Sequence, residues 1–477
     1  MLPTIATGNV ASAIGGGYEV ANSCRFNDGD SAYMHKTPAG AGNLRTFTIS
    51  LWIKRGALGT RKALFNNTDG DGQEGVYYDF QADDTLLISD YGTGSYDWNL
   101  ETTQVFRDTS AWYHIVIAVD TEQAVAANRV KLYVNGSQIT AFDAANYPSE
   151  DADTLWNTTD RFEIGSYNGT GNFFDGYLAE VVHIDGLQLA ATSFGEFDED
   201  SPTIWKPIDV SGLTFGTNGF YLDFEDSSNL GNDANGGTDL TEVNLAAADS
   251  ASDTPTNNFA TMNPLDNYWQ GSTFSYGNNR IATASSPYTW NTASIGLSAG
   301  LWYFETKVVT AAGSNYQQVG VSSRPTINAT TYLGDEEWTY GYNGFNGKIY
   351  NNGDNSYGDT HTTGDIIGVY LDLTNSKLYF AKNGTIQNSG TGFDITAVGS
   401  TDTGLYFPAA GDWGSSYTAT FDFNFGGSPA FAVSSGNADA NGYGSFEYDP
   451  SDGGSSSFDS AAKDFLAICT KNLAEYG

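Results

Sequence analysis

Short runs in which apolar and polar residues alternate recur along the chain, separated by Gly, Asn and Asp. A clear case is Thr-Phe-Thr-Ile-Ser-Leu-Trp-Ile-Lys at 46–54, and a more continuously apolar run follows at 112–119. A period of two is typical of strands with one buried face, and turn residues between such runs favour antiparallel sheets. We find no long segment with the 3.6-residue period of an amphipathic helix. The pattern predicts an all-β protein.

One hairpin pattern occurs twice. An apolar run ending in Val119-Asp120 is followed by Lys-Leu-Tyr-Val-Asn-Gly at 131–136, and a run ending in Leu371-Asp372 is followed by Lys-Leu-Tyr-Phe-Ala-Lys-Asn-Gly at 377–384. Asn-Gly between strands is typical of a type I′ turn, which needs positive φ at both central residues. The copies lie too far apart for a solenoid or propeller. They predict two separate β-sandwiches of similar topology.

Changes in composition divide the chain into five segments. The second and fourth are dense in strand signals; the third alternates short strand-like pieces with Ser, Asn, Asp and Gly and is expected to have little core. The segments are an anchoring N-terminus at 1–20, a sandwich at 21–190, an extended bridge at 191–264, a second sandwich at 265–428 and a Gly/Ser/Asp-rich tail at 429–477.

The two ends are expected to dock. Residues 1–20 are small and Gly-rich, so that a partner chain is expected to hold them. Near the other end, one face of a short helix is predicted to carry Phe465, Leu466, Ile468, Cys469 and Leu473. This helix would dock on the same chain or on a neighbour.

Charge and cysteine content narrow the possible partners. The formal net charge of −37 argues against nucleic acid and against an anionic membrane surface, because both recruit Lys and Arg. Cys24 and Cys469 form no zinc pattern and are predicted to be buried free thiols. Neither a signal peptide nor a membrane-spanning run is apparent, so synthesis in a cytoplasm is expected.

Sequence motifs for catalysis are weak. Glycosidases on sandwich folds place two carboxylates on one strand face about 5 Å apart. The nearest string here, Glu-Phe-Asp-Glu-Asp at 196–200, sits in a loop-like stretch outside both predicted sandwiches. His114 and His183 lie within strands, where a hydrogen-bonded sheet histidine is the simpler interpretation than a catalytic base. We expect no enzymatic activity.

An acidic loop is the candidate metal site. Asp69, Asp71 and Glu74 fall within Asp-Gly-Asp-Gly-Gln-Glu, and calcium takes several oxygens in flexible geometry. The string begins like an EF-hand loop but lacks the remainder. Calcium is therefore the candidate cofactor, although a solvated acidic turn is the interpretation that we favour for this loop.

Aromatic residues beside amides and acids suggest a sugar-binding loop. Tyr91, Tyr96 and Trp98 lie within Tyr-Gly-Thr-Gly-Ser-Tyr-Asp-Trp-Asn, and such rings can stack on a pyranose while polar groups bind its hydroxyls. Packing of these rings in the core is the alternative.

Two families resemble the chain at specific strands. The chain resembles the laminin-G-like (concanavalin A-like) superfamily over roughly 20–190. The resemblance is carried by residues 47–54, 112–114, 131–136, 162–165 and 176–180. The later part of the chain resembles a SPRY domain. The resemblance is carried by residues 302–305, 319–321, 338–340, 364–369, 377–384, 405–408 and 411–414. The resemblance implies two concanavalin A-like jelly-roll β-sandwiches in series. It also implies a SPRY ligand surface of loops at one end, on which the matching residues are Arg324, Tyr332, Asp412 and Trp413.

The whole arrangement is similar to virion proteins of tailed bacteriophages. That similarity implies a virion component (a tail fibre, a baseplate appendage, or a head fibre or decoration) that acts by multivalent display. The expected partners are other virion proteins, host-surface glycan or protein, and further copies of the chain. The alternatives are a purely structural decoration or cement protein without a ligand, and a polysaccharide depolymerase.

Overall fold

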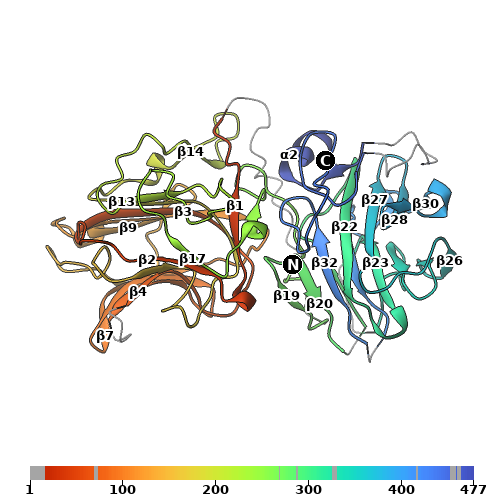
Figure 1. The fold of residues 1–477 in the computed structure, drawn as a ribbon, viewed down its shortest axis with the longest axis horizontal. Helices are drawn as coiled ribbons and strands as arrows, with labels where there is room; N and C mark the ends of the chain where they lie inside the picture. The colour runs from red at the N-terminus through yellow and green to blue at the C-terminus, as the bar shows by residue number, and fades with distance from the viewer. Residues whose placement is uncertain are drawn as a thin grey trace. The chain divides into compact units, whose positions relative to one another are not determined.

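The computed structural model describes residues 17–68, 74–267, 269–285, 288–324, 330–414, 417–451, 458 and 464–477. The described residues up to Thr256 form one unit, and those from Asn257 onwards form a second (Figure 1). Each unit is a sandwich of two mainly antiparallel sheets, and the all-β prediction with two jelly-roll sandwiches in series is confirmed.

The first strand of the first unit, β1 (Ser23–Phe26), pairs with its last strand, β18 (Ser250–Ala251). One sheet has the order β10 (Ser137–Gln138), β9 (Val130–Val134), β8 (Trp112–Asp120), β3 (Thr46–Arg55), β13 (Gly176–Asp185), β1 (Ser23–Phe26) and β18 (Ser250–Ala251), with β16 (Phe220–Leu222) also on β13. The facing sheet has the order β11 (Phe142–Asn146), β7 (Ser95–Val105), β6 (Thr85–Gly92), β5 (Gly75–Phe80), β4 (Lys62–Thr68), β12 (Phe162–Ile164), β2 (Tyr33–Lys36) and β17 (Thr241–Val243).

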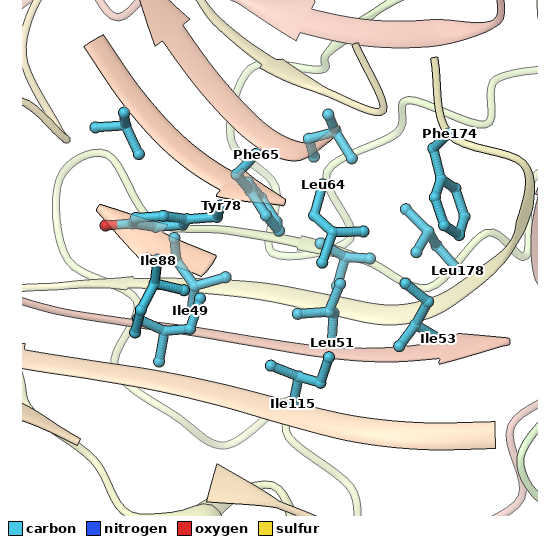
Figure 2. Packing of buried hydrophobic residues seen from close by; sticks show 14 of the residues in the cluster. Ile49, Leu51, Ile53, Leu64, Phe65, Tyr78, Ile88, Ile115, Phe174 and Leu178 are labelled. Atoms are coloured by element: carbon cyan, nitrogen blue, oxygen red, sulfur yellow. The ribbon is translucent and has the colours of Figure 1, made fainter. Parts of the chain in front are cut away.

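The core of this unit lies between the two sheets. Alternate residues of β3, namely Ile49, Leu51 and Ile53, point inward and meet Leu64 and Tyr78 of the facing sheet (Figure 2). All five side chains are fully or almost fully buried. Period-two alternation along β3 therefore fixes which face of the sheet becomes core.

The structure differs from the expected extended bridge between 191 and 256, which is folded into the first unit. Its strands β16, β17 and β18 pair with β13, β2 and β1. A further hairpin of β14 (Gly195–Phe197) and β15 (Trp205–Pro207) brings Trp205 over the outer face of the first sheet, where Trp52 and Val182 would otherwise be exposed. The apolar outer face needs a cover, and this segment supplies it.

The second unit has the same architecture with different strand order. One sheet runs β19 (Thr273–Ser275), β20 (Arg280–Ala282), β32 (Thr420–Asn424), β22 (Leu301–Thr310), β27 (Ile366–Asp372), β28 (Lys377–Lys382) and β29 (Thr385–Ile386), with β30 (Phe393–Asp394) on β28 and β33 (Leu466–Ala467) on β22. The other runs β21 (Thr289–Thr292), β31 (Phe407–Asp412), β23 (Gln317–Ser322), β24 (Thr339–Asn343), β25 (Lys348–Tyr350) and β26 (Asp354–Ser356).

The helical segments among the described residues are short. They are α1 (Ala126–Arg129), α2 (Thr470–Tyr476) and the 3-10 turns Asp28–Asp30, Ala191–Ser193, Ala247–Asp249, Gly313–Asn315, Asn388–Gly390 and Val398–Ser400.

Both predicted Asn-Gly hairpins are present. Asn135 and Gly136 have φ of 46° and 77°, and Asn383 and Gly384 have φ of 48° and 77°, as a type I′ turn requires. Each Asn side chain also accepts a backbone N–H from a neighbouring strand, that of His114 on β8 or that of Ile366 on β27, at 2.7 and 2.8 Å.

The C-terminal segment docks on its own unit. The predicted short helix is confirmed as α2, but it starts at Thr470, because the preceding residues form β33 parallel to β22. Phe465, Ile468 and Cys469 are fully buried, so this segment is part of the second core. The prediction that Cys24 and Cys469 are buried free thiols is confirmed.

The predicted anchoring segment spans residues 1–20. Its residues 1–16 lie outside the described part of the chain.

Candidate binding surface

Aromatic rings from separate loops of the second unit gather into one cluster. Trp413, just after β31, has its ring centroid 4.9 Å from that of Tyr332, 5.2 Å from that of Tyr316 and 5.4 Å from that of Tyr350. Tyr316 lies 4.9 Å from Phe345. We call these five residues the aromatic cluster. Tilted and T-shaped pairs at such distances are favourable ring geometries.

Backbone contacts hold the cluster in place. Trp413 donates its backbone N–H to the carbonyl oxygen of Tyr316 at 3.0 Å. The side chain of Asn343 accepts the backbone N–H of Phe345 at 3.0 Å, which fixes the turn after β24. Rigid strands therefore position the loops that carry the rings.

The cluster is only partly covered. Phe345 is 49% exposed, Tyr350 is 7% exposed, and the rings of Tyr316, Tyr332 and Trp413 are half-buried. Burial raises the pKa of the Tyr332 hydroxyl, with the Asp335 carboxylate adding to the effect, so that this tyrosine stays neutral at physiological pH. Exposed Tyr, Trp and Phe on loops are characteristic of protein-binding surfaces.

The structure brings together two of the four predicted SPRY ligand residues, Tyr332 and Trp413. The predicted role of Asp412 is corrected, since its side chain is fully buried and accepts a hydrogen bond from the Thr283 hydroxyl. Arg324 is engaged by two carboxylates, those of Glu336 at 2.8 Å and Asp402 at 2.7 Å.

Tyr316, Phe345 and Tyr350 were missed by sequence reasoning. Phe345 follows Asn-Gly within a Gly/Asn-rich stretch, and this turn composition is the one signal that an aromatic there would be exposed. Tyr316 and Tyr350 carry no such signal, since both adjoin strands.

The aromatic residues of the predicted sugar-binding loop, Tyr91, Tyr96 and Trp98, do not share one environment in the first unit. Tyr91 and Tyr96 form a T-shaped pair at 5.3 Å, and Tyr96 is 45% exposed. Trp98 is corrected to a core residue, 3% exposed and packed in the cluster between the sheets. It lies opposite Asp90 on β6, where the sheet is covered on its inner face.

Calcium binding at the acidic loop stays a prediction. Asp69 and Asp71 lie outside the described residues. The carboxylate of Glu74 accepts a hydrogen bond from the Thr93 hydroxyl at 2.5 Å. In the part of the chain that the structure describes, no three His, Cys, Asp or Glu side chains are arranged to hold a metal ion.

A buried Ser–His contact in the first unit has the wrong hydrogen bonding for general base catalysis. His114 Nε2 lies 2.9 Å from Ser50 Oγ, but Trp205 donates its indole N–H to His114 Nδ1 at 2.9 Å. A neutral imidazole that accepts at Nδ1 must carry its proton on Nε2, so it donates to Ser50. Burial lowers the pKa of His114 to about 3, which keeps the ring neutral.

The acidic residues at 196–200, the nearest match to a glycosidase motif, stabilise a turn and pair with a lysine. Asp198 accepts the backbone N–H groups of Asp200 and Ser201, and Lys206 lies 3.4 Å from both Glu196 and Asp198.

Residues 28–186 match the concanavalin A-like lectin/glucanases superfamily, and residues 301–427 match the SPRY domain. Ran-binding protein 10 of Danio rerio and Ran-binding protein 9 of Homo sapiens are each 34% identical over 87 residues, 18% of this chain. This chain covers only 14% and 12% of their lengths. The SPRY domain of human HERC1 is 20% identical, with a TM-score of 0.29, over 34% of this chain and 96% of that one.

Among the described helices, none is long and apolar enough to cross a membrane.

These relatives contradict the prediction of a bacteriophage virion protein. They are Ran-binding proteins of animals, so the expected tail-fibre or decoration role, the virion location, and the virion-protein and host-glycan partners are corrected. That prediction rested on the order of domains, which unrelated proteins can share. The two domain assignments themselves are confirmed: this chain carries a concanavalin A-like domain followed by a SPRY domain.

Proposed function

We propose that the chain is a non-catalytic protein-binding module, and that the aromatic cluster of its SPRY domain is the surface that contacts a partner protein. The observation that carries this proposal is the meeting of Tyr332, Trp413, Tyr316 and Phe345 from separate loops, with the Phe345 ring half exposed.

The charge around the cluster suits a partner with apolar and polar groups rather than a polyanion. Arg324, the cation predicted for the SPRY ligand surface, is neutralised by Glu336 and Asp402, and its guanidinium lies 5.2 Å from the Trp338 ring. With a net charge of −37, the chain as a whole repels anions. The relatives in Danio rerio and Homo sapiens are Ran-binding proteins, which supports a protein as the class of partner.

The proposal is tested by selection from a yeast-displayed random peptide library with the full chain as bait. Selected peptides are expected to lose most of their affinity for Trp413→Ala and Phe345→Ala. Phe197→Ala is the matched control, because Phe197 is an equally exposed aromatic (45%) on the first unit. Peptides that bind all three variants as well as the unaltered chain, or a library that yields no binder, would contradict the proposal.

A further inference from the structure

Two buried carboxamides lie side by side on the sheet that carries the aromatic cluster. Gln318 of β23 is directly opposite Asn343 of β24 on one side and Gly411 of β31 on the other. Residues that oppose each other in antiparallel strands project to the same face. Both carboxamide side chains have an exposed fraction of 0%.

Three polar atoms of this pair have no hydrogen-bonding partner. Among the described residues, nothing bonds to Oε1 or Nε2 of Gln318 or to Nδ2 of Asn343. The Oδ1 atom of Asn343 accepts the Phe345 N–H, so the orientation of that amide is set and its Nδ2 is the free end. Buried polar atoms without partners cost folding free energy, and native proteins keep few of them.

The same face of the sheet carries the aromatic cluster. Tyr350 is opposite Gly341 of β24, and Trp413 stands two residues beyond Gly411, so alternation projects both to the side of Gln318. Tyr332, Tyr350 and Trp413 then contact one another above this face.

Glycine leaves room for the Gln318 head group. A Cβ on Gly341 would lie 3.2 Å from Gln318 Nε2 and 2.5 Å from the Leu333 carbonyl oxygen. Glycine within a strand often marks a place where another group approaches the backbone closely. The amides therefore lie in a layer between the strands and the rings.

We propose that Gln318 and Asn343 form the floor of a subsite for one planar amide group of the partner, reached when the half-buried ring of Trp413 turns outward. This inference rests on the proposed function. The floor offers N–H donors from both residues and an acceptor, Gln318 Oε1. A carboxylate would be repelled by that oxygen and an ammonium by the Asn343 amide, whereas a peptide group or a carboxamide side chain presents both a donor and an acceptor.

The decisive variant is Gln318→Met, which keeps the length of the side chain and removes its polar atoms. It is expected to weaken the Trp413-dependent peptides at least about tenfold, since two hydrogen bonds are lost, and to raise the melting temperature of the unliganded chain. Unchanged peptide affinity in Gln318→Met, with binding still lost in Trp413→Ala, would overturn the subsite and leave the proposed surface intact.

A second measurement uses no selected peptide. Crystals of the full chain are soaked with N-methylacetamide, which mimics a main-chain peptide group, and in parallel with propionamide, which mimics a carboxamide side chain. Density for either compound on Gln318 and Asn343 would support the subsite and distinguish the two sources of the amide. Ordered water bonded to all three atoms in both soaks would overturn it.

Discussion

The rings of Tyr332 and Trp413 lie 4.9 Å apart, although the two residues come from loops far apart in the chain. Trp413 leaves β31 beside Gln317, at the start of β23, whereas Tyr332 belongs to the segment that joins the opposite ends of β23 and β24, Ser322 and Thr339. That segment returns over β24 and β25, where the Leu333 carbonyl oxygen lies against Gly341 and the Gly334 carbonyl oxygen accepts the Asn352 N–H at 2.9 Å, and this brings Tyr332 to Trp413. The strands hold the loops that carry these two rings, and the rings stay partly exposed. The SPRY fold can therefore present them to a partner, as proposed.

Two substitutions of Asn383 should separate the contributions of its side chain and of its backbone conformation to stability. Asn383→Ala loses the side-chain acceptor for the Ile366 N–H and places alanine at a φ of 48°, so we expect a loss of about 1–3 kcal/mol in the free energy of unfolding. Asn383→Gly keeps the backbone conformation and should lose less. Urea denaturation measures both, and equal losses would show that backbone strain contributes nothing.

These hairpins show what the sequence could predict. The turns depend on the Asn-Gly pair itself, whose positive φ the two letters already indicate. The bonds from Asn135 to His114 and from Asn383 to Ile366 reach the neighbouring strands, and the pair of letters does not reveal them. Trp98 shows the reverse case: Tyr96 and Trp98 alternate like residues of one face, yet the first is 45% exposed and the second is buried. A shift in register between β6 and β7 at Asp90 and Tyr91 separates them, and no local pattern encodes it.

The segment 191–256 was misjudged for a similar reason. Its strands are two or three residues long, too short for alternation to be recognised, and they are strands only because β13, β2 and β1 offer edges. The aromatic cluster likewise arises from tertiary contact between loops, so Tyr316 and Tyr350 could not be assigned to it from the sequence.

Asp90 should make the stability of the first unit depend on pH. Burial raises the pKa of this carboxyl from 3.8 to about 7, and the nearby Asp97 acts in the same direction, whereas the Leu155 N–H opposes it. Because the folded pKa lies above the unfolded one, the contribution of Asp90 is fully present below pH 4 and is lost as pH rises through 7. Each unit of pKa difference corresponds to about 1.4 kcal/mol.

The test of this effect is Asp90→Asn. The variant should be more stable than the unaltered chain at pH 8 and similar to it at pH 4, as measured by urea denaturation at both values. The amide retains an acceptor for the Leu155 N–H, which Asp90 bonds at 2.7 Å. If both proteins lose stability equally between pH 4 and pH 8, Asp90 is not the group responsible.

Trp205→Phe isolates the hydrogen bond that sets the tautomer of His114. A phenyl ring can still stack near the imidazole, 5.9 Å away in the native pair, but it leaves the buried Nδ1 without its donor at 2.9 Å. We expect a loss of about 1–3 kcal/mol in unfolding free energy. Phe197→Ala, at an exposed position beside Trp205, serves as the control and should cost less.

The C-terminal segment should contribute strongly to the SPRY domain. Ile468 is fully buried in its core, so Ile468→Ala is expected to cost about 2–5 kcal/mol. Tyr476→Ala, at a side chain that is 41% exposed, should change stability by no more than about 0.5 kcal/mol. Differential scanning calorimetry separates them, and equal melting temperatures would show that the segment is dispensable.

The aromatic cluster is proposed to bind protein. The most direct measurement is isothermal titration of a library-selected peptide into the full chain, Trp413→Ala, Phe345→Ala and Phe197→Ala. We expect the two cluster variants to weaken binding at least about tenfold, equivalent to about 1.4 kcal/mol, and Phe197→Ala to bind as the unaltered chain does. Equal affinity across all four proteins would contradict it.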